Sequence, residues 1–475
     1  MRIDVRALAI LLVTILTTSC ASIPEDAGFG DVQTTVVERT GQHVQWDQDT
    51  DADRAAENAV QRMLSQPLNA DEAAQIALLN NRGLRAVYED LSLTQANLVQ
   101  AGLLTNPIFS TAVGFPLDGG SVDLTFSIVQ DFLSILYRPL RRQIARAQFQ
   151  STKLRVTEAV IELAAHVRGQ FYDVQADSQR LEFLQQVVTA TAASAELARR
   201  FYDAGNITEL DLAREQALYQ EARLALATAQ TRLIQNRERL NALMGLWGED
   251  TQWTIVPRLP ELPMASKALP LQAADLEQRA IRANLGLGAA RKEIRSAAGI
   301  LGFTNATALV PFFEPGVDAE REESEWEIGP SLAFPIPIFN QGQARLAAAR
   351  AQLRQAQQTY WAQAVEIRAA VRAARQTALS ARNRARYVKD VLLPAYTRVV
   401  NNTQLQYNAM QVGAFQLLAA KQLQINAGLR YIGTLLEYWM ARTALEQILN
   451  GSMADLEITP VAEIPQGGFP AISVM

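Results

Sequence analysis

Residues that commonly do chemistry in proteins are sparse in this sequence. The 475-residue chain holds two histidines, His43 and His166, and one cysteine, Cys20. A metal cluster built from histidine and cysteine ligands is therefore excluded within one chain, and so is a disulfide framework. The sequence has no phosphate-binding glycine loop and no nucleophile elbow, and its carboxylates are scattered along the chain. It therefore predicts no enzyme, no metal site and no cofactor.

Composition narrows the class of protein further. The chain is 49% hydrophobic and 20% charged, which is typical of neither a disordered chain nor a helical membrane protein. Its formal net charge of -5 gives no reason to expect a nucleic-acid partner.

The single cysteine follows a segment typical of a secretory signal. Residues 1–19 carry two arginines, then an apolar core, then small residues before Cys20. Cys20 stands where a bacterial lipoprotein signal has its acylated residue, although Thr17 replaces the usual Leu or Val. The sequence predicts a lipidated Cys20, and an ordinary cleaved signal with an incidental cysteine is the alternative.

Most of the chain consists of two copies of one unit. The motif ARAQ at 145–148 recurs at 349–352. We expect one repeat over 69–246, a second over 271–451, and a Pro-rich linker at 247–270 between them.

The two ends of the chain lack helical periodicity. We therefore expect an extended, lipidated N-terminal segment at 20–68 and an irregular C-terminal segment at 452–475.

Each repeat has the same order of elements. A helix comes first, and in the first repeat Asn69–Glu72 forms a plausible capping box. A β-hairpin follows, at about 107–130 or about 305–337. A long helix then leads to a turn, at about 204–208 or about 409–413, and a second helix returns.

The returning helices show heptad spacing, which is typical of coiled-coil packing. The stripe of the first repeat is Ala222, Leu226, Ala229, Leu233, Asn236, Leu240 and Leu243; that of the second is Ala427, Tyr431, Thr434, Tyr438, Ala441, Leu445 and Ile448.

The hairpin segments alternate apolar residues with small or polar ones. This alternation is typical of transmembrane β-strands, and a half-buried sheet in water would show the same pattern. In the membrane interpretation the lipid face holds Phe109, Phe115, Val122, Leu124, Phe126, Ile128, Trp326, Ile328, Leu332 and Phe334. Asp123, Glu325 and Glu327 would then lie on the opposite face and favour cations.

The expected second hairpin pairs a strand at 305–313 with one at 325–334. The acidic run Asp318–Glu325 between them is expected to be a solvated loop. Two hairpins give four strands per chain, whereas even small barrels need about eight. A membrane barrel therefore requires several copies in a ring, and three copies would supply twelve strands.

The sequence resembles the TolC-like outer-membrane efflux proteins, particularly their lipoprotein branch. The resemblance rests on AGLLTNPIFS, FPIPIFNQGQARLAAARAQLRQAQ, YDAGNITELDLAREQ and LNALMGL, and it extends from about Asn69 to Gly451. It implies a mainly α-helical homotrimer with a twelve-strand β-barrel above a long α-helical barrel. It also implies a passive exit duct in the outer membrane, working with a periplasmic adaptor and an inner-membrane transporter of the resistance-nodulation-division type.

The resemblance places the periplasmic gate and the adaptor contact at the two helical turns. The residues carried over are Gly205, Asn206, Thr208, Asp211, Tyr407, Met410, Gln411, Gly413 and Gln416. Met410 stands where the family has a second glycine, and Gln416 stands where it often has a carboxylate. We expect Asp211 to bond the Tyr407 hydroxyl between neighbouring coils; the alternative is that Asp211 only stabilises the start of its own helix.

A periplasmic coiled-coil adaptor or structural protein without a channel is the rival interpretation. Adaptors also have long helical hairpins, but one each, and no strand hairpins inserted at matching positions.

Overall fold

The computed structural model describes residues 24, 26–48, 50–115, 122–263, 275–322 and 325–454. The predicted signal segment, Cys20 and most of the C-terminal segment lie outside these residues. The described chain is mainly helical and forms two compact units. Unit 1 holds the described residues up to Val32 together with Ala86–Thr157 and Leu285–Ala364, and unit 2 holds Gln33–Arg85, Glu158–Asn284 and the chain from Val365 onward.

Unit 1 combines long helical segments with one β-sheet. Its helices are α6 (Phe132–Leu136), α10 (Leu285–Ala306) and parts of α5 (Arg82–Gly102), α7 (Arg138–Asp203) and α11 (Gln343–Tyr387). α10 lies close against α7, since a Cβ added at Gly299 would come within 2.7 Å of Ile144 Cγ1. Glycine at this position therefore sets the distance between the two helices.

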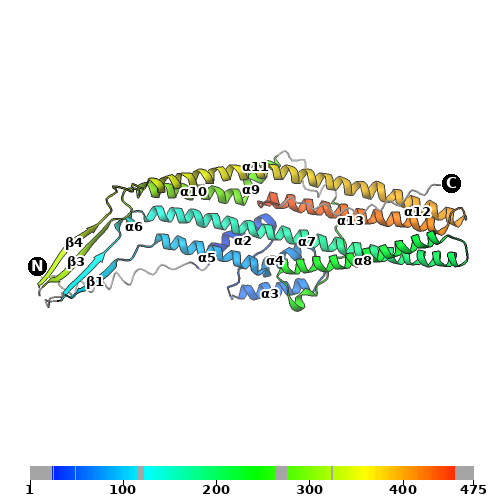
Figure 1. The fold of residues 1–475 in the computed structure, drawn as a ribbon, viewed down its shortest axis with the longest axis horizontal. Helices are drawn as coiled ribbons and strands as arrows, with labels where there is room; N and C mark the ends of the chain where they lie inside the picture. Colours follow the sequence, from blue (N-terminus) through cyan, green and yellow to red (C-terminus); the bar gives the residue numbers. More distant parts are fainter. Residues whose placement is uncertain are drawn as a thin grey trace. The chain divides into compact units, whose positions relative to one another are not determined.

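The sheet of unit 1 is antiparallel with the order β1-β2-β3-β4 (Figure 1). Its strands are β1 (Ile108–Gly114), β2 (Asp123–Val129), β3 (Glu314–Glu322) and β4 (Glu325–Ala333). The two predicted hairpins therefore join through β2 and β3 into one sheet, and β1 and β4 form its edges.

Part of the acidic run expected to be a loop is in fact strand: Asp318–Glu322 lies in β3, and Glu325 begins β4. The expected partner strand at 305–313 is also wrong, because Asn305 and Ala306 end α10 instead. The register explains the shift, since Gly316 pairs with Val129 at the end of β2. Val317 and Ala319 then alternate with acidic side chains, so the segment is amphipathic as a strand although its composition resembles a loop.

Unit 2 is built from helices α3 (Asp51–Leu64), α4 (Ala70–Asn80), α8 (Glu209–Met244), α9 (Leu276–Ala283), α12 (Leu393–Asn408) and α13 (Ala414–Asn450), with the remainder of α7 and α11. A π-helical turn at Val388–Leu392 separates α11 from α12. α8 folds back beside α7, and α13 folds back beside α12, as Figure 1 shows. Among the described residues, no helix combines the length and the apolar character needed to cross a bilayer.

Both predicted heptad stripes are confirmed as packing faces. Every stripe position on α8 and α13 is buried or partly buried, whereas most flanking positions on α8 are exposed. The expected capping box of α4 is also confirmed, because Asn69 Oδ1 accepts from the backbone N–H groups of Asp71 and Glu72, and the Glu72 carboxylate accepts from the Asn69 N–H.

The described part of the N-terminal segment, mainly 26–48 and 50–68, is not extended, which corrects the prediction. It forms α2 (Phe29–Thr40) and α3. Phe29, Val32 and Val36 are buried and stand three and four residues apart, so a short helical period is present within the segment. The sequence analysis missed this period because α2 has only 12 residues.

Candidate functional site

The turn between α7 and α8 is the first half of the predicted gate. Gly205 N–H donates to Tyr202 O at 2.8 Å, and Asn206 N–H donates to Phe201 O at 2.8 Å. These bonds satisfy the last carbonyls of α7 and require a left-handed residue at the turn. Gly205 supplies it with φ +73°, as the sequence predicts.

The turn between α12 and α13 has the same backbone form without a glycine. Met410 N–H donates to Tyr407 O at 2.9 Å, and Gln411 N–H donates to Gln406 O at 2.9 Å. Met410 occupies the left-handed position with φ +58°, and its side chain is 94% exposed. The turn therefore forms without a glycine, and a strained, exposed methionine stands at its tip.

The two returning helices begin differently. Thr208 Oγ1 donates to Asp211 Oδ2 at 2.7 Å and accepts from the Asp211 N–H at 3.2 Å, which completes a capping box. The Thr208 hydroxyl and then its backbone N–H lower the pKa of Asp211 by stabilising the carboxylate. α13 begins after Gly413, which has no side chain with which to cap it.

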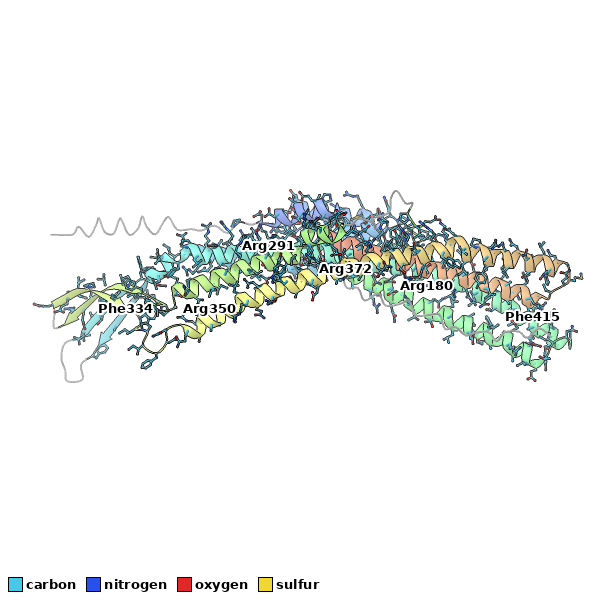
Figure 2. The ribbon with its side chains drawn as sticks, turned by 90° about the horizontal axis from the view of Figure 1, so that it is seen from above. Arg180, Arg291, Phe334, Arg350, Arg372 and Phe415 are labelled. Atoms are coloured by element: carbon cyan, nitrogen blue, oxygen red, sulfur yellow. The ribbon has the colours of Figure 1, made fainter. Side chains whose placement is uncertain are left out.

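A ring contact joins the two helical hairpins close to their turns. The rings of Phe201 on α7 and Phe415 on α13 meet edge to face, with centroids 6.0 Å apart and planes at 85°. Figure 2 labels Phe415 at this end of α13. The predicted gate residues of the turns are otherwise largely exposed, including Asn206, Tyr407, Gln411 and Gln416. Together they form an exposed surface at the turns.

Asp211 is occupied within its own chain. Besides Thr208, it lies 3.9 Å from the Arg214 guanidinium. These contacts fit the alternative interpretation, in which Asp211 stabilises the start of its own helix. The bond from Tyr407 to Asp211 between neighbouring coils stays a prediction.

In unit 1 the strand register gathers the predicted lipid-face residues on one face of the sheet. Phe109 pairs with Ile128, Phe126 pairs with Thr111 and Ala319, and Ile328 also pairs with Ala319. The Phe126 ring lies between the rings of Phe109 and Trp326, with centroids 6.1 and 5.9 Å away. Leu124 and Leu332 follow on this face by alternation, while Phe115, Val122 and Phe334 flank the strands and are exposed. Figure 2 labels Phe334 just beyond β4.

The opposite face of the sheet carries carboxylates. Asp318 pairs in register with Ser127, whose hydroxyl donates to the Asp318 carboxylate, and Glu320 pairs with Glu327. This acidic face, defined here as Asp123, Glu314, Asp318, Glu320, Glu325 and Glu327, follows from the strand alternation. The sequence analysis assigned Asp123, Glu325 and Glu327 to this face but missed the other three, because β3 was expected to be a loop.

A polar cluster between α7 and α8 was missed entirely. Asp177 is 2% exposed and receives bonds from Arg180 at 3.1 Å, Arg232 at 3.2 Å and Asn236 at 2.6 Å. Burial, followed by the charge of Asp177, raises the pKa of neighbouring Asp173 to about 6. The sequence offered one signal of this cluster, Asn236 at a heptad position. A buried amide needs a polar partner, so Asn236 indicates a polar side chain on the facing helix.

Comparison with known proteins finds a partial family match, a curated relative and solved structures of the same fold. Residues 73–246 match the model of the outer membrane efflux protein family. The chain is 25% identical over 391 residues to the cobalt-zinc-cadmium resistance protein CzcC of Cupriavidus metallidurans, covering 81% of this chain and 90% of that protein.

Two solved outer-membrane channels share the fold. The CmeC channel of Campylobacter jejuni has a TM-score of 0.68 at 13% identity, with 92% of this chain and 94% of that chain covered. The open MtrE channel of Neisseria gonorrhoeae has a TM-score of 0.63 at 16% identity, with 81% and 89% covered.

Proposed function

We propose that the chain is a TolC-like outer membrane efflux protein and serves as the outer-membrane channel subunit of a tripartite efflux system. In this role it is a passive exit duct and not an enzyme. An inner-membrane pump delivers the substrate through a periplasmic adaptor. The proposal rests on two observations together: the family match, and a four-stranded sheet with one aromatic, apolar face and one acidic face.

The proposed assembly is a homotrimer. In the four-stranded sheet, β1 and β4 are edges whose outer backbone groups need partners. Three copies joined edge to edge would form a barrel of twelve strands, with the aromatic face toward lipid and the acidic face toward the lumen. Lipidation at Cys20 would add an anchor to the outer membrane.

Cysteine cross-linking tests the edge pairing. Ser110→Cys on β1 and Gly329→Cys on β4 should give covalent trimers when combined in one chain. Each single variant should stay monomeric under denaturing conditions. A doubly substituted chain that yields no cross-linked trimer in outer-membrane preparations would contradict the barrel.

We propose further that the duct passes cations. CzcC is named for resistance to cobalt, zinc and cadmium, and the acidic face would line the lumen. Glu320→Gln combined with Glu327→Gln should lower the cation-to-anion permeability ratio in planar bilayers. Arg321→Gln, on the opposite face of β3, is the matched control and should leave the ratio unchanged.

The exposed turns of unit 2 are the proposed gate and adaptor contact, and a pump of the resistance-nodulation-division type is the proposed energy source. If Tyr407 of one coil holds Asp211 of another, Tyr407→Phe should raise the conductance of the closed channel several-fold. Tyr202→Phe, on the first turn, is its control. Unchanged conductance in Tyr407→Phe would eliminate the latch while leaving the duct intact.

A further inference from the structure

An exposed apolar patch lies at α6, where the sheet of unit 1 meets its helices. The patch consists of Phe132, Ile135 and Leu136, which are 49%, 39% and 57% exposed. α6 connects β2 to α7, so the patch stands between the sheet and the longest helix (Figure 1). Apolar side chains that gather on an exposed surface mark a place where another molecule or a membrane is contacted.

A row of aromatic rings joins this patch to the aromatic face of the sheet. Phe132 N–H donates to Phe313 O at 3.0 Å, so the pairing of β2 with β3 continues beyond the strands. The centroid of the Phe313 ring lies 6.2 Å from that of Phe132 and 6.5 Å from that of Phe334. By alternation, Phe132 and Phe334 stand on the same side as Phe126 and Trp326. The proposed lipid face therefore extends down to the patch.

Three exposed arginines follow the patch along α7. Arg138, Arg142 and Arg146 stand four residues apart, so they form one stripe with about 6 Å between neighbours. None of the three has a hydrogen bond or an ion pair with another described residue. Arg141 differs, because it donates to Ser134 O at 2.9 Å. We call the three exposed residues the arginine stripe.

The chain segments around the arginine stripe contain no carboxylate that could neutralise it. Aspartate and glutamate are absent from the start of α7, the end of α5 and the end of α10, that is from residues 132–157, 91–107 and 294–313. α5 is a direct neighbour, because a Cβ added at Gly102 would lie 3.9 Å from Arg142 Cδ. Asp131 is occupied at the start of α6, where it accepts from the Ser134 N–H. The stripe is thus locally uncompensated, although the whole chain carries a net charge of -5.

The stripe lies on the side of α7 that meets the N-terminal segment. Phe149 and Lys153 continue the same side of the helix two turns further on, and a Cβ added at Gly28 would lie 3.1 Å from Phe149 Cζ. Lys153 also forms an ion pair with Asp31. Gly28 is eight residues from Cys20, a span of at most about 29 Å. A lipid at Cys20 would therefore reach the membrane along this side, which makes it the outer side of the proposed duct.

We propose that the arginine stripe binds the phosphate groups of anionic phospholipids in the periplasmic leaflet of the outer membrane, and that the apolar patch enters the acyl region of the same leaflet. Arginine suits this partner, because its planar fork can donate two hydrogen bonds to one phosphate. The start of α7 adds the positive end of a helix. The inference rests on the proposed position in the outer membrane, and it adds a preference for anionic over zwitterionic headgroups.

Native mass spectrometry of the full-length chain in detergent tests the proposal with matched lipids. Dioleoyl-phosphatidylglycerol should bind about tenfold more tightly than dioleoyl-phosphatidylcholine, which has the same acyl chains and no net charge. Combining Arg138→Gln, Arg142→Gln and Arg146→Gln should remove this preference and leave the binding of phosphatidylcholine unchanged. Leu136→Ser should instead weaken the binding of both lipids alike, because the apolar contact does not depend on the headgroup.

A charge-matched variant is the control. It removes three exposed arginines of unit 2, far along the chain from the sheet, through Arg199→Gln, Arg223→Gln and Arg398→Gln. This control should keep the preference for phosphatidylglycerol. An equal loss in the control and in the stripe variant would show that net charge alone attracts the lipid, which would overturn the proposal.

Three other results would also overturn it. They are equal binding of the two lipids by the parent chain, an unchanged preference in the stripe variant, and displacement of phosphatidylglycerol by inorganic phosphate, which would indicate a site for free anions. If the stripe variant changed the cation-to-anion permeability ratio in planar bilayers without changing lipid binding, the arginines would line the lumen instead. The proposed barrel would stand in each case, because cross-linking between β1 and β4 tests it separately.

Discussion

The two helical hairpins of unit 2 share one backbone plan and are held together by different chemistry. Between α7 and α8, Asp177 is buried against Asn236 and two arginines. At the matching positions of the second repeat stand Ala381 and Ala441, both buried and apolar. The first hairpin therefore depends on a satisfied polar cluster, and the second depends on close packing of small side chains.

The same contrast continues at the turns. The first turn has its glycine and a complete capping box, whereas the second has a left-handed methionine and a helix start without a side-chain cap. Local interactions thus stabilise the conformation of the first turn and leave that of the second less stable. If one turn moves when the duct opens, the difference indicates the second, because local opening occurs where stabilising interactions are fewest.

The largest effect should come from removing Asp177. Asp177→Ala leaves Arg180, Arg232 and Asn236 without their shared partner, and the expected loss of stability is about 3–5 kcal/mol. Hydrogen exchange measured by mass spectrometry should show faster exchange in α7 and α8. Asp177→Ala combined with Asn236→Ala, which copies the second hairpin, should recover part of the loss. If the single variant exchanges like the parent chain, the polar cluster does not hold the first hairpin.

Exchanging the left-handed residues tests the contrast at the turns. Gly205→Met should cost about 1–2 kcal/mol, because a Cβ is strained at this φ although space around Gly205 is open. Met410→Gly should stabilise the second turn by roughly 1 kcal/mol for the same reason. The exchange rates of the Asn206 and Gln411 amides report each turn separately. Effects of the same sign in both variants would refute the proposed asymmetry.

Acidity should also affect the hairpins differently, through Asp173. The pKa of Asp173 is about 6, above its unfolded value, because of burial and then the charge of Asp177; Arg232, Arg180 and Arg239 oppose the rise. The folded state therefore binds the proton more tightly, so the first hairpin loses stability as pH rises from about 4 to about 6. Asp173→Asn should remove this slope and gain on the order of 1 kcal/mol at pH 7. The second hairpin, with Thr377 at the matching position, is the internal control for a pH series of hydrogen exchange.

The parts that the sequence predicted well are those with a strong local period. The heptad stripes, the capping box at Asn69 and the turn at Gly205 each follow from a few neighbouring residues. Strand β3 and helix α2 were missed because their assignment depends on partners. Glu314–Glu322 becomes a strand only when β2 offers its edge, and the 12 residues of α2 are too few for a clear period.

The candidate site divides in the same way. The positions of both turns and one face of the sheet were predictable, because turn residues and alternation are local signals. The Asp177 cluster was not, because its members are 55 and 59 residues apart in sequence across the turn. The resemblance placed Met410 at the position of a family glycine but could not show that the turn survives the substitution; the backbone bonds from Met410 and Gln411 hold Met410 in the left-handed conformation.

The smallest expected effects concern the helix starts, and they separate capping from the left-handed residue. Thr208→Ala removes the acceptor for the Asp211 N–H and should cost about 1 kcal/mol at the first turn of α8. Gly413→Thr would offer α13 the cap that it lacks, with a gain of only a few tenths of a kcal/mol, because glycine itself is tolerated at a helix start.

The lowered pKa of Asp211 makes the stability of this helix start depend on pH. The stabilisation that the Asp211 carboxylate contributes is present above its unfolded pKa and is lost as pH falls through its folded pKa. Exchange at the start of α8 should therefore quicken in acid in the parent chain. In Thr208→Ala it should be fast already at neutral pH, so an acid dependence as large as that of the parent would show that Asp211 acts through the helix dipole without the threonine.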